Sequence, residues 1–302
     1  MLLININLLI KEMPQNKKNI TVRVSSGLGN QLFMFCNAFY LSEKYNLKLK
    51  IDDKSSFFQK KNLSDNRLSK LKFFKISDDC YRDVKYYDSQ IKHVYRKILL
   101  ILNKNNFYLE HKYKNTKKTF YKPIKLKQNK NIEISGHFES EKYFIKSKKK
   151  LQNMLVPNNA YNSKYIELLK NSNSVSIHVR TKAFYGYAYQ NFNKKKPILI
   201  QDQINYINKS ILFMRSKLRN PKFFIWSDDI KLIKKYFNPS IFKFINTKDD
   251  ILDFYLFSFC KHFIVSPSSY HWMGAWLNKN KNKICLRPNY MTPSNNINFW
   301  PK

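Results

Sequence analysis

Residues 20–45 read ITVRVSSGLGNQLFMFCNAFYLSEKY. Apolar and polar residues alternate over the first five positions, which is typical of a β-strand. After two glycines, Leu32, Phe35 and Phe39 recur at helical spacing, so a helix with one buried face follows the turn. Residues 47–51 return to strand character. The stretch therefore predicts a strand, a glycine turn, a helix and a second strand, which is one βαβ unit.

The rest of the chain continues this alternation of strands and helices. Repeated alternation of this kind predicts doubly wound parallel sheets of the α/β class, with ligands at the carboxyl ends of the strands. The predicted strands are 132–135, 175–180, 222–226, 241–245, 262–265 and 283–287, and the predicted helices are 202–218, 229–237, 250–260 and 268–277.

Composition divides the chain into three parts. Residues 146–173 are rich in Ser, Asn and Lys and contain Pro157, which is typical of a boundary. We expect an N-terminal extension over residues 1–19, a Rossmann-like domain over 20–160 and a second Rossmann-like domain over 161–302. Hydrophobic residues make up 43% of the 302, which is enough for a core in each domain and excludes wholesale disorder.

The charge of the chain is strongly positive, because 56 Lys and Arg residues oppose 20 Asp and Glu residues and give a formal net charge of +36. A basic protein that binds nucleic acid is one interpretation. Only eight of the 56 are arginines, however, whereas phosphate and base readers favour clustered arginine. We expect a solvated lysine surface with no specific nucleic-acid partner, which would attract an anionic membrane peripherally.

The cysteines and the start of the chain bear on its compartment. The four cysteines share no C-x-x-C spacing and are predicted to be buried thiols in a reducing compartment. Residues 1–10 are apolar but interrupted by asparagines, and a membrane span needs about 20 residues. No small-residue cleavage site follows them. These features predict a cytoplasmic protein, with any membrane contact on the inner face of the cytoplasmic membrane.

Four segments at predicted strand ends carry candidate chemistry, and the first is the glycine turn over residues 27–31. Two glycines before a helix let backbone N–H groups approach an anion closely, although a tight turn without a ligand fits the spacing equally well. A dinucleotide fingerprint needs a third small residue where this chain has Leu32. A nicotinamide-dependent oxidoreductase, with Asp52 or Asp53 on the ribose, is therefore an alternative that Leu32 disfavours.

The second segment is SIHVR over residues 176–180, in which Ser176, His178 and Arg180 share one face of the predicted strand. An unpaired guanidinium in a sheet covered on both faces is costly, so Arg180 needs an anion. A protein carboxylate and a ligand phosphate both meet that need, and the bidentate fork of arginine favours phosphate. His178 by itself fits a hydrogen-bonded core histidine as well as a ligand contact.

The third and fourth segments lie between a strand and a helix. Of Asp228 and Asp229, one is expected to cap the helix and the other to bind a ligand such as the donor edge of a guanine. Ser268 or Ser269 caps the later helix, and the remaining hydroxyl and N–H groups form a second anion site. The sequence has no metal-ligand motif and no Walker loop, so nothing in it demands a metal.

Together these segments resemble glycosyltransferase family 11, the α-1,2-fucosyltransferases, of the bacterial type. Residues 27–31 match the family's G-G-L-G-N-Q opening, with Ser26 in place of the first glycine. Residues 223–230 are similar to its F-F-I-F-S-D-D-I, and residues 260–278 to its C-K-H-x-I-x-x-N-S-S-F-S-W-W-G-A-W-L-N. The order and spacing of the segments agree over about residues 20–290.

The family's H-x-R-R-G-D-Y motif is divergent in this chain and reads H-V-R-T-K-A-F over residues 178–184. Thr181 stands at the second arginine and Ala183 at the acid. A charge-assisted hydrogen bond is worth about 1.5–3 kcal/mol, so the loss of one is expected to weaken donor binding or slow departure of the nucleotide. Lys182 is a point charge that compensates for part of that loss.

The resemblance implies a GT-B fold, with two Rossmann-like domains facing a cleft, and an inverting reaction without a metal or other cofactor. In it the domain over 20–160 lies on the acceptor side and the domain over 161–302 binds the GDP-sugar. It implies that Arg180 stabilises the donor diphosphate as the sugar leaves. It does not identify the general base, because Ala183 removes one candidate acid. The implied donor-binding residues are His178, Asp228, Ser268, Ser269, Gly27, Gly29, Asn30, Gln31 and Lys182.

The implied reaction moves L-fucose from GDP-β-L-fucose to the 2-hydroxyl of a terminal galactose, in a surface glycan or a lipid-linked oligosaccharide. The expected partners are thus a GDP-sugar donor and a galactose-terminated acceptor. A related transferase that uses another GDP-sugar is the alternative within the same class. A basic nucleic-acid-binding protein is the alternative outside it.

Overall fold

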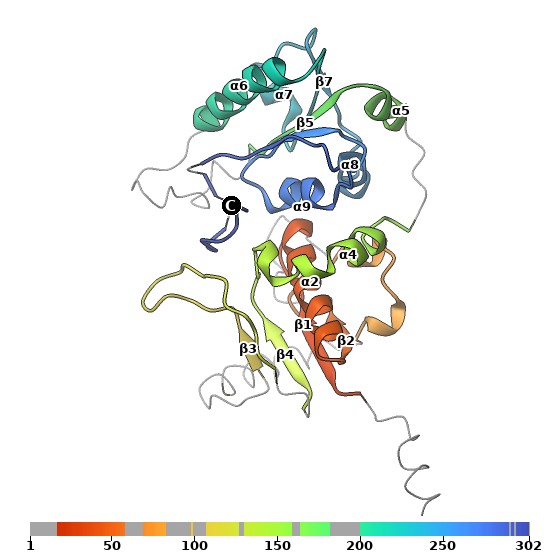
Figure 1. The fold of residues 1–302 in the computed structure, drawn as a ribbon, viewed down its shortest axis with the longest axis vertical. Helices are drawn as coiled ribbons and strands as arrows, with labels where there is room; N and C mark the ends of the chain where they lie inside the picture. The colour runs from red at the N-terminus through yellow and green to blue at the C-terminus, as the bar shows by residue number, and fades with distance from the viewer. Residues whose placement is uncertain are drawn as a thin grey trace, which may run out of the picture.

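A computed structural model describes residues 17–57, 69–82, 98, 107–126, 130–158, 164–181, 200–289, 291–292 and 294–301. In these ranges the chain forms two parallel sheets, one in each half, with helices packed between and around them (Figure 1). Most of the predicted extension over residues 1–19 lies outside the described residues.

The first sheet has the strand order β2-β1-β4-β3, and all its neighbours are parallel. The strands are β1 (Asn19–Arg23), β2 (Lys48–Asp52), β3 (Phe107–Leu109) and β4 (Ile132–Ser135). Helix α2 (Leu28–Lys44) connects β1 to β2, so the predicted βαβ unit is confirmed. The short strand β3 was not predicted, because its three residues lie in a lysine-rich stretch that lacks a clear period.

The second sheet is also entirely parallel and has the order β7-β6-β5-β8-β9. Every strand predicted there from the alternating pattern is present, which confirms the doubly wound organisation of this half. The strands are β5 (Ser174–Val179), β6 (Lys222–Ser227), β7 (Phe242–Phe244), β8 (His262–Ile264) and β9 (Cys285–Leu286), and the helices are α6 (Ile200–Lys217), α7 (Ile230–Ile233), α8 (Asp250–Phe257) and α9 (Ser269–Leu277).

Short helices occupy the connecting regions of the first half. The segment predicted as an irregular boundary contains two helices, α4 and α5, because its lysines and asparagines form the exposed faces of helices that bury Leu151 and Leu169. These elements are α4 (Lys148–Met154), α5 (Lys164–Asn171) and the 3-10 turns η1 (Leu71–Phe73), η2 (Asp78–Cys80), η3 (Glu141–Tyr143) and η4 (Ile145–Ser147).

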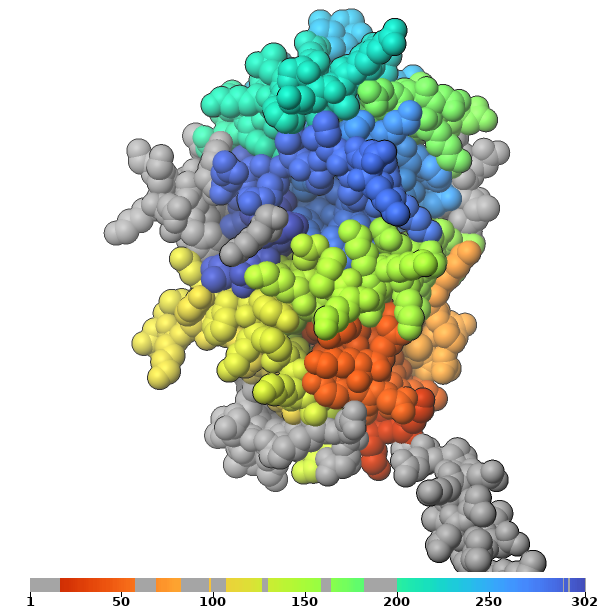
Figure 2. All heavy atoms as spheres, viewed as in Figure 1, coloured from red at the N-terminus to blue at the C-terminus, as the bar shows by residue number. Residues whose placement is uncertain are grey.

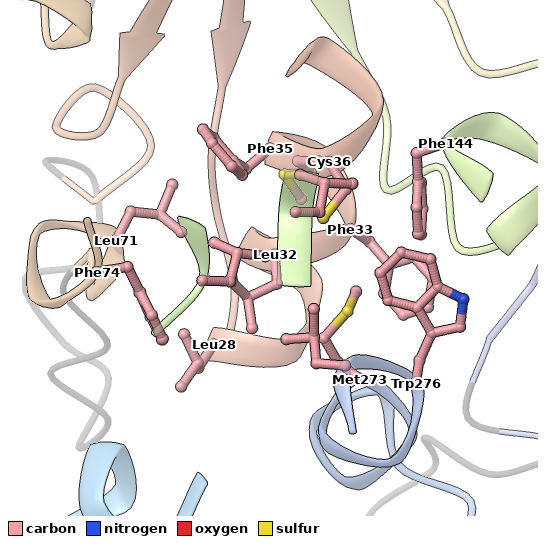
Figure 3. Close-up of a cluster of buried hydrophobic side chains, with 14 of the residues drawn as sticks. Leu28, Leu32, Phe33, Phe35, Cys36, Leu71, Phe74, Phe144, Met273 and Trp276 are labelled. Atoms are coloured by element: carbon pink, nitrogen blue, oxygen red, sulfur yellow. The ribbon is translucent and has the colours of Figure 1, made fainter. Parts of the chain in front are cut away.

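The two halves meet where α2 packs on α9, and Figure 3 shows side chains of both helices in one buried cluster. The rings of Phe33 and Trp272 lie 4.6 Å apart across this contact. Gly29, in the first turn of α2, allows the helices to approach, since a Cβ there would lie 2.3 Å from the backbone nitrogen of Tyr270. One apolar core therefore joins the halves, and their atoms lie directly against each other (Figure 2).

The C-terminal segment, residues 291–292 and 294–301, packs on the first half. The backbone nitrogen of Thr119 donates to Asn295 O at 2.9 Å, and Ile297 N donates back to Thr119 O at 3.0 Å. Phe299 is 1% exposed and lies 5.9 Å from the Phe33 ring. In Figure 1 this segment lies beside the loop that follows β3. The end of the chain thus helps to build the first half.

Two further findings concern the compartment predictions. Cys36 and Cys260 are buried as predicted, whereas Cys80 is half-buried and Cys285 is exposed, because both lie in short elements at the margins of the sheets. Among the described residues, no helix combines the length and apolarity needed to cross a bilayer.

Candidate functional site

Each sheet has a topological switch point, the place where the chain connections leave in opposite directions and where open α/β sheets bind ligands. In the second sheet it lies between β5 and β8, and in the first sheet between β1 and β4. The sequence places three of the four candidate segments at or beside the β5/β8 point. The first segment, the glycine turn, follows β1.

A buried polar network lies at the β5/β8 switch point. His178 Nδ1 lies 3.1 Å from Ser266 Oγ, and Ser266 N donates to His271 Nδ1 at 3.4 Å. Because that nitrogen of His271 accepts, its Nε2 carries the hydrogen and donates to Ser176 Oγ at 2.8 Å. Burial lowers the pKa of His178 to about 4 and that of His271 well below its ordinary value. Both rings are therefore neutral at pH 7.

Arg180 follows directly after β5 and is half-buried. Gln203 of α6 holds its backbone: Arg180 N donates to Gln203 Oε1 at 3.3 Å, and Gln203 Nε2 donates to Arg180 O at 3.2 Å. No carboxylate among the described residues forms an ion pair with the guanidinium. A protein acid as the partner of the Arg180 guanidinium is therefore not found among the described residues. The predicted ligand anion at Arg180 stays a prediction.

Of the two aspartates after β6, one caps the following helix as predicted. Asp229 caps α7, since its carboxylate accepts from Leu232 N at 2.9 Å. Asp228 Oδ1 accepts from Thr181 N at 2.7 Å and from Thr181 Oγ1 at 2.8 Å. Thr181, which stands where related sequences carry an arginine, therefore fixes the exposed Asp228 carboxylate beside the end of β5. The predicted contact of Asp228 with a nucleoside stays a prediction.

The start of α9 contributes a second group of polar atoms. Ser268 is the N-cap residue, but its hydroxyl makes no cap hydrogen bond and is buried without a partner among the described residues. Ser269 donates its hydroxyl to Asn30 Oδ1, so these two predicted donor-binding side chains bond to each other across the α2/α9 contact. Of the two serines, only Ser268 has a hydroxyl left for a ligand at the helix N-terminus.

The glycine turn has mainly structural contacts in the structure. Gln31 is 1% exposed; its Nε2 donates to Ser26 O at 2.8 Å, and its Oε1 accepts from Lys70 N at 2.9 Å. Its side chain therefore stabilises the turn, and Gly29 lies in the α2/α9 contact. Gly27 has open space at its Cβ position, so it is the residue of the turn that a ligand could approach most closely. Lys182 lies outside the described residues.

A pocket of about 1280 Å³ lies in the first half, at the carboxyl ends of β3 and β4. Its wall includes Glu110, His137 and Glu139, and the C-terminal segment closes one side with Asn295. Drug-sized ligands occupy pockets of about 300–1,000 Å³, so this volume suits an extended ligand. None of these residues was predicted. A Gly-His-x-Glu sequence directly after the predicted strand 132–135 is the signal that would have located two of them.

Glu110 is the central group of this pocket wall. Its Oε1 accepts from Thr119 Oγ1 at 3.0 Å and from Asn296 Nδ2 at 2.7 Å, and its Oε2 accepts from the backbone nitrogens of His137 and Phe138, both at 3.0 Å. Glu139 is fully buried and receives a hydrogen bond from Ser294 Oγ. Burial raises the pKa of Glu139 to about 7. No group of three or more metal-ligating side chains occurs in the described ranges.

Comparisons with known proteins show the family of the chain. A family model described as Glycosyl transferase family 11 matches residues 2–295. An Escherichia coli alpha-1,2-colitosyltransferase is 28% identical over 279 residues, which cover 89% of this chain and 91% of that protein. The Escherichia coli O-antigen biosynthesis glycosyltransferase WbnK is 26% identical over 299 residues, which cover 90% of this chain and 95% of that protein.

The fold is also similar to a solved structure. The fucosyltransferase NodZ from Bradyrhizobium aligns with a TM-score of 0.51 at 10% identity, over 92% of this chain and 98% of that chain. At this identity the likeness concerns the fold alone. With the two parallel sheets, it confirms the predicted α/β architecture of GT-B type.

Proposed function

The chain belongs to glycosyl transferase family 11, and from that membership we propose that it transfers L-fucose from GDP-β-L-fucose to the 2-hydroxyl of a terminal galactose. The acceptor galactose ends a surface glycan or a lipid-linked oligosaccharide. The family match favours a glycosyltransferase over the nucleic-acid-binding protein and the nicotinamide-dependent oxidoreductase.

Arg180 carries this proposal. Its guanidinium follows β5 at the switch point of the second sheet and has no carboxylate partner among the described residues. Arginine binds phosphate in a bidentate fork, and the unpartnered Ser268 hydroxyl lies at the N-terminus of α9, where the helix dipole favours an anion. A nucleoside diphosphate supplies the anion that both groups lack.

The same groups account for the chemistry. As the sugar leaves, negative charge develops on the β-phosphate, and fixed donors that face this charge lower the barrier. In this proposal Arg180 and the start of α9 supply that stabilisation without a metal. The neutral His178 and the tethered Asp228 contact the nucleoside. The acceptor hydroxyl attacks the anomeric carbon from the opposite side in a single displacement, so the configuration inverts.

Another GDP-sugar as donor is the second candidate. The relative described as an alpha-1,2-colitosyltransferase supports it, because that protein matches 89% of this chain. Fucose and colitose donors place the same kind of anion at Arg180, so the groups described above serve either. Release of GDP, measured across several GDP-sugars with galactose-terminated oligosaccharides, decides between them: the preferred donor gives the highest kcat/KM.

Calorimetric titration of GDP tests the proposal itself. We expect the parent protein to bind GDP and Arg180→Ala to bind it about 10- to 100-fold more weakly, since a charge-assisted hydrogen bond contributes about 1.5–3 kcal/mol. Arg219→Ala, which removes an exposed arginine beyond α6, is the matched control and should bind as the parent does. A parent protein without measurable GDP binding, or equal affinities for both variants, would contradict the proposal.

Peripheral contact with an anionic membrane is a further part of the proposal, and the net charge of +36 supports it. Cosedimentation with anionic liposomes should be strong at low salt and fall as salt is added, because exposed charges are screened. Binding that increases with salt would contradict an electrostatic contact.

A further inference from the structure

We propose that His137 is the general base of the transfer reaction and that the pocket beside it binds the acceptor glycan. This inference rests on the proposed transferase function and deepens it. It assigns the acceptor side of the reaction to the first sheet, whereas the donor groups described above belong to the second.

The placement of His137 is the first argument. It follows β4, and Ser26 follows β1, so the two residues flank the switch point of the first sheet. His137 Nε2 lies 3.4 Å from Ser26 Oγ. Three residues after Ser26, Gly29 lies against the first turn of α9, which carries Ser268 at its start. His137 thus lines the pocket on one side and contacts, on the other, the turn that leads to the donor groups.

The backbone around His137 is strained, which is the second argument. Gly136 has a φ of 147°, and Phe138, a bulky residue, has a φ of 50°. Left-handed backbone is unfavourable for a residue with a large side chain, and such strain persists only where the surroundings enforce it. Here the Glu110 carboxylate enforces it by accepting from the backbone nitrogens of His137 and Phe138. The turn is held rigidly in a conformation that presents the imidazole to the pocket.

The charge state of His137 suits a base. Burial lowers its pKa; the Glu110 carboxylate opposes this effect, and the Lys112 ammonium adds to it. The pocket wall also carries the Glu139 carboxyl, the His111 imidazole, the Tyr108 hydroxyl and the ammonium groups of Lys112, Lys117, Lys122 and Lys125. At pH 7 the imidazole is therefore neutral, and one ring nitrogen keeps a lone pair that can accept a proton.

The proposed step conserves atoms and electrons. The acceptor hydroxyl oxygen forms a bond to the anomeric carbon of the donor sugar, while the bond from that carbon to the β-phosphate oxygen breaks. GDP leaves with the electron pair of the broken bond. The hydroxyl proton passes to the unprotonated ring nitrogen of His137, which becomes an imidazolium and later returns the proton to water. Ala183 stands where the family carries an acid, so this chain needs a base from elsewhere.

Glu139 is the competing base, and its contacts favour His137. The Glu139 carboxyl is fully buried and holds Ser294 of the C-terminal segment by a hydrogen bond. This arrangement ties the segment to the pocket wall. Burial raises the pKa of Glu139 to about 7 and lowers the pKa of His137, and the variant in which the acid limb of the pH profile vanishes separates the two bases.

The test compares His137→Gln, His137→Ala and Glu139→Gln with the parent. We expect His137→Gln to lower kcat of transfer about 100-fold or more, the usual contribution of a general base, with GDP affinity unchanged within about threefold. Hydrolysis of the donor without acceptor should persist in it. Added imidazole should restore part of the activity of His137→Ala, and Glu139→Gln should lose much less activity than His137→Gln.

The pH profile and the thermal unfolding of each variant complete the test. Parent kcat/KM should fall on the acid side, and this limb should vanish in His137→Gln and persist in Glu139→Gln. A midpoint near 7 that vanishes in Glu139→Gln, or His137→Gln with full transfer activity, would overturn the proposal. A folded His137→Gln that no longer binds GDP would also overturn it. A parent protein that binds no GDP would instead refute the proposed function, so the two failures are distinguishable.

Discussion

The two switch points of this molecule use their polar groups in different ways. At the β5/β8 point, the Arg180 guanidinium has no carboxylate partner among the described residues. The Ser268 hydroxyl is buried there without a hydrogen-bond partner among the same residues. Beside the β1/β4 point, Glu110, which follows β3, accepts hydrogen bonds from four groups of its own chain through its carboxylate. In this account Arg180 and Ser268 are left for a ligand, whereas the groups around Glu110 hold one turn.

This difference separates binding from positioning. Polar groups that lack partners are costly to bury, and the proposed diphosphate would satisfy those at this edge. Polar groups that are fully hydrogen-bonded within the protein hold the backbone in one conformation. Here they hold the strained turn that contains Gly136 and Phe138. Four substitutions test this contrast, and they differ in the size of the effect that we expect.

Glu110→Gln should have the largest effect. The amide nitrogen that replaces one carboxylate oxygen cannot accept a hydrogen bond, and its N–H groups would face two of the four groups that now donate to Glu110. We expect the free energy of unfolding to fall by about 4 kcal/mol, measured by urea denaturation. Glu167→Gln in α5 is the control; that side chain is exposed and its loss should cost less than about 0.5 kcal/mol. Equal effects of both substitutions would show that the turn does not depend on Glu110.

Gly29→Ala tests the contact between the halves. The added Cβ would meet the backbone of Ser269 and Tyr270 at 2.3–2.7 Å, which neither helix relieves without moving. We expect a loss of about 3 kcal/mol in thermal or urea unfolding. Gly27→Ala is the matched control, because nothing lies within 4 Å of its Cβ position. Should both variants unfold alike, the close approach of α2 and α9 would be refuted.

Glu139→Gln should stabilise the protein in a pH-dependent way. Because the folded pKa is raised from 4.5 to about 7, the native state binds the proton more tightly, and stability falls as pH rises from about 4.5 to 7. Glutamine resembles the protonated form. It should therefore raise the free energy of unfolding by about 3 kcal/mol at pH 8 and leave it nearly unchanged at pH 4.5. A gain of the same size at both values would contradict the burial of an ionisable carboxyl.

The smallest expected effect concerns Ser26, which has a φ of 66°. Glycine adopts this left-handed conformation without steric cost, so Ser26→Gly should be more stable than Ser26→Ala by about 1 kcal/mol in differential scanning calorimetry. Both variants lack the hydroxyl that faces His137, so the difference in their stability measures only the cost of the left-handed backbone at this position. The reverse order of stability would show that the turn at Ser26 is not left-handed.

The second half could be predicted from sequence because its strands and helices have strong local periods. Strand β5 is buried along its whole length, and the caps of α7 and α8 are aspartates, as a helix start requires. The cap at Asp229 followed from the same local rule. Predictions of this kind need no information about distant residues.

The first half could be predicted only in part, because its pocket depends on contacts between distant positions. Strand β3 has three residues and no period of its own, and it is ordered by pairing with β4. Glu110 and Asn296 are 186 positions apart and bond to each other in the fold. The role of Gln31 shows the same limit, since Lys70, its partner, is 39 positions away. Tertiary packing, which local pattern does not encode, decides such sites.

A crystal structure of the protein with GDP bound tests the division between donor and acceptor sides most directly. The account predicts the diphosphate within hydrogen-bond distance of the Arg180 guanidinium and the start of α9, with the pocket beside His137 empty of nucleotide. GDP seated in the pocket of the first sheet, or a diphosphate that makes no contact with Arg180, would contradict it.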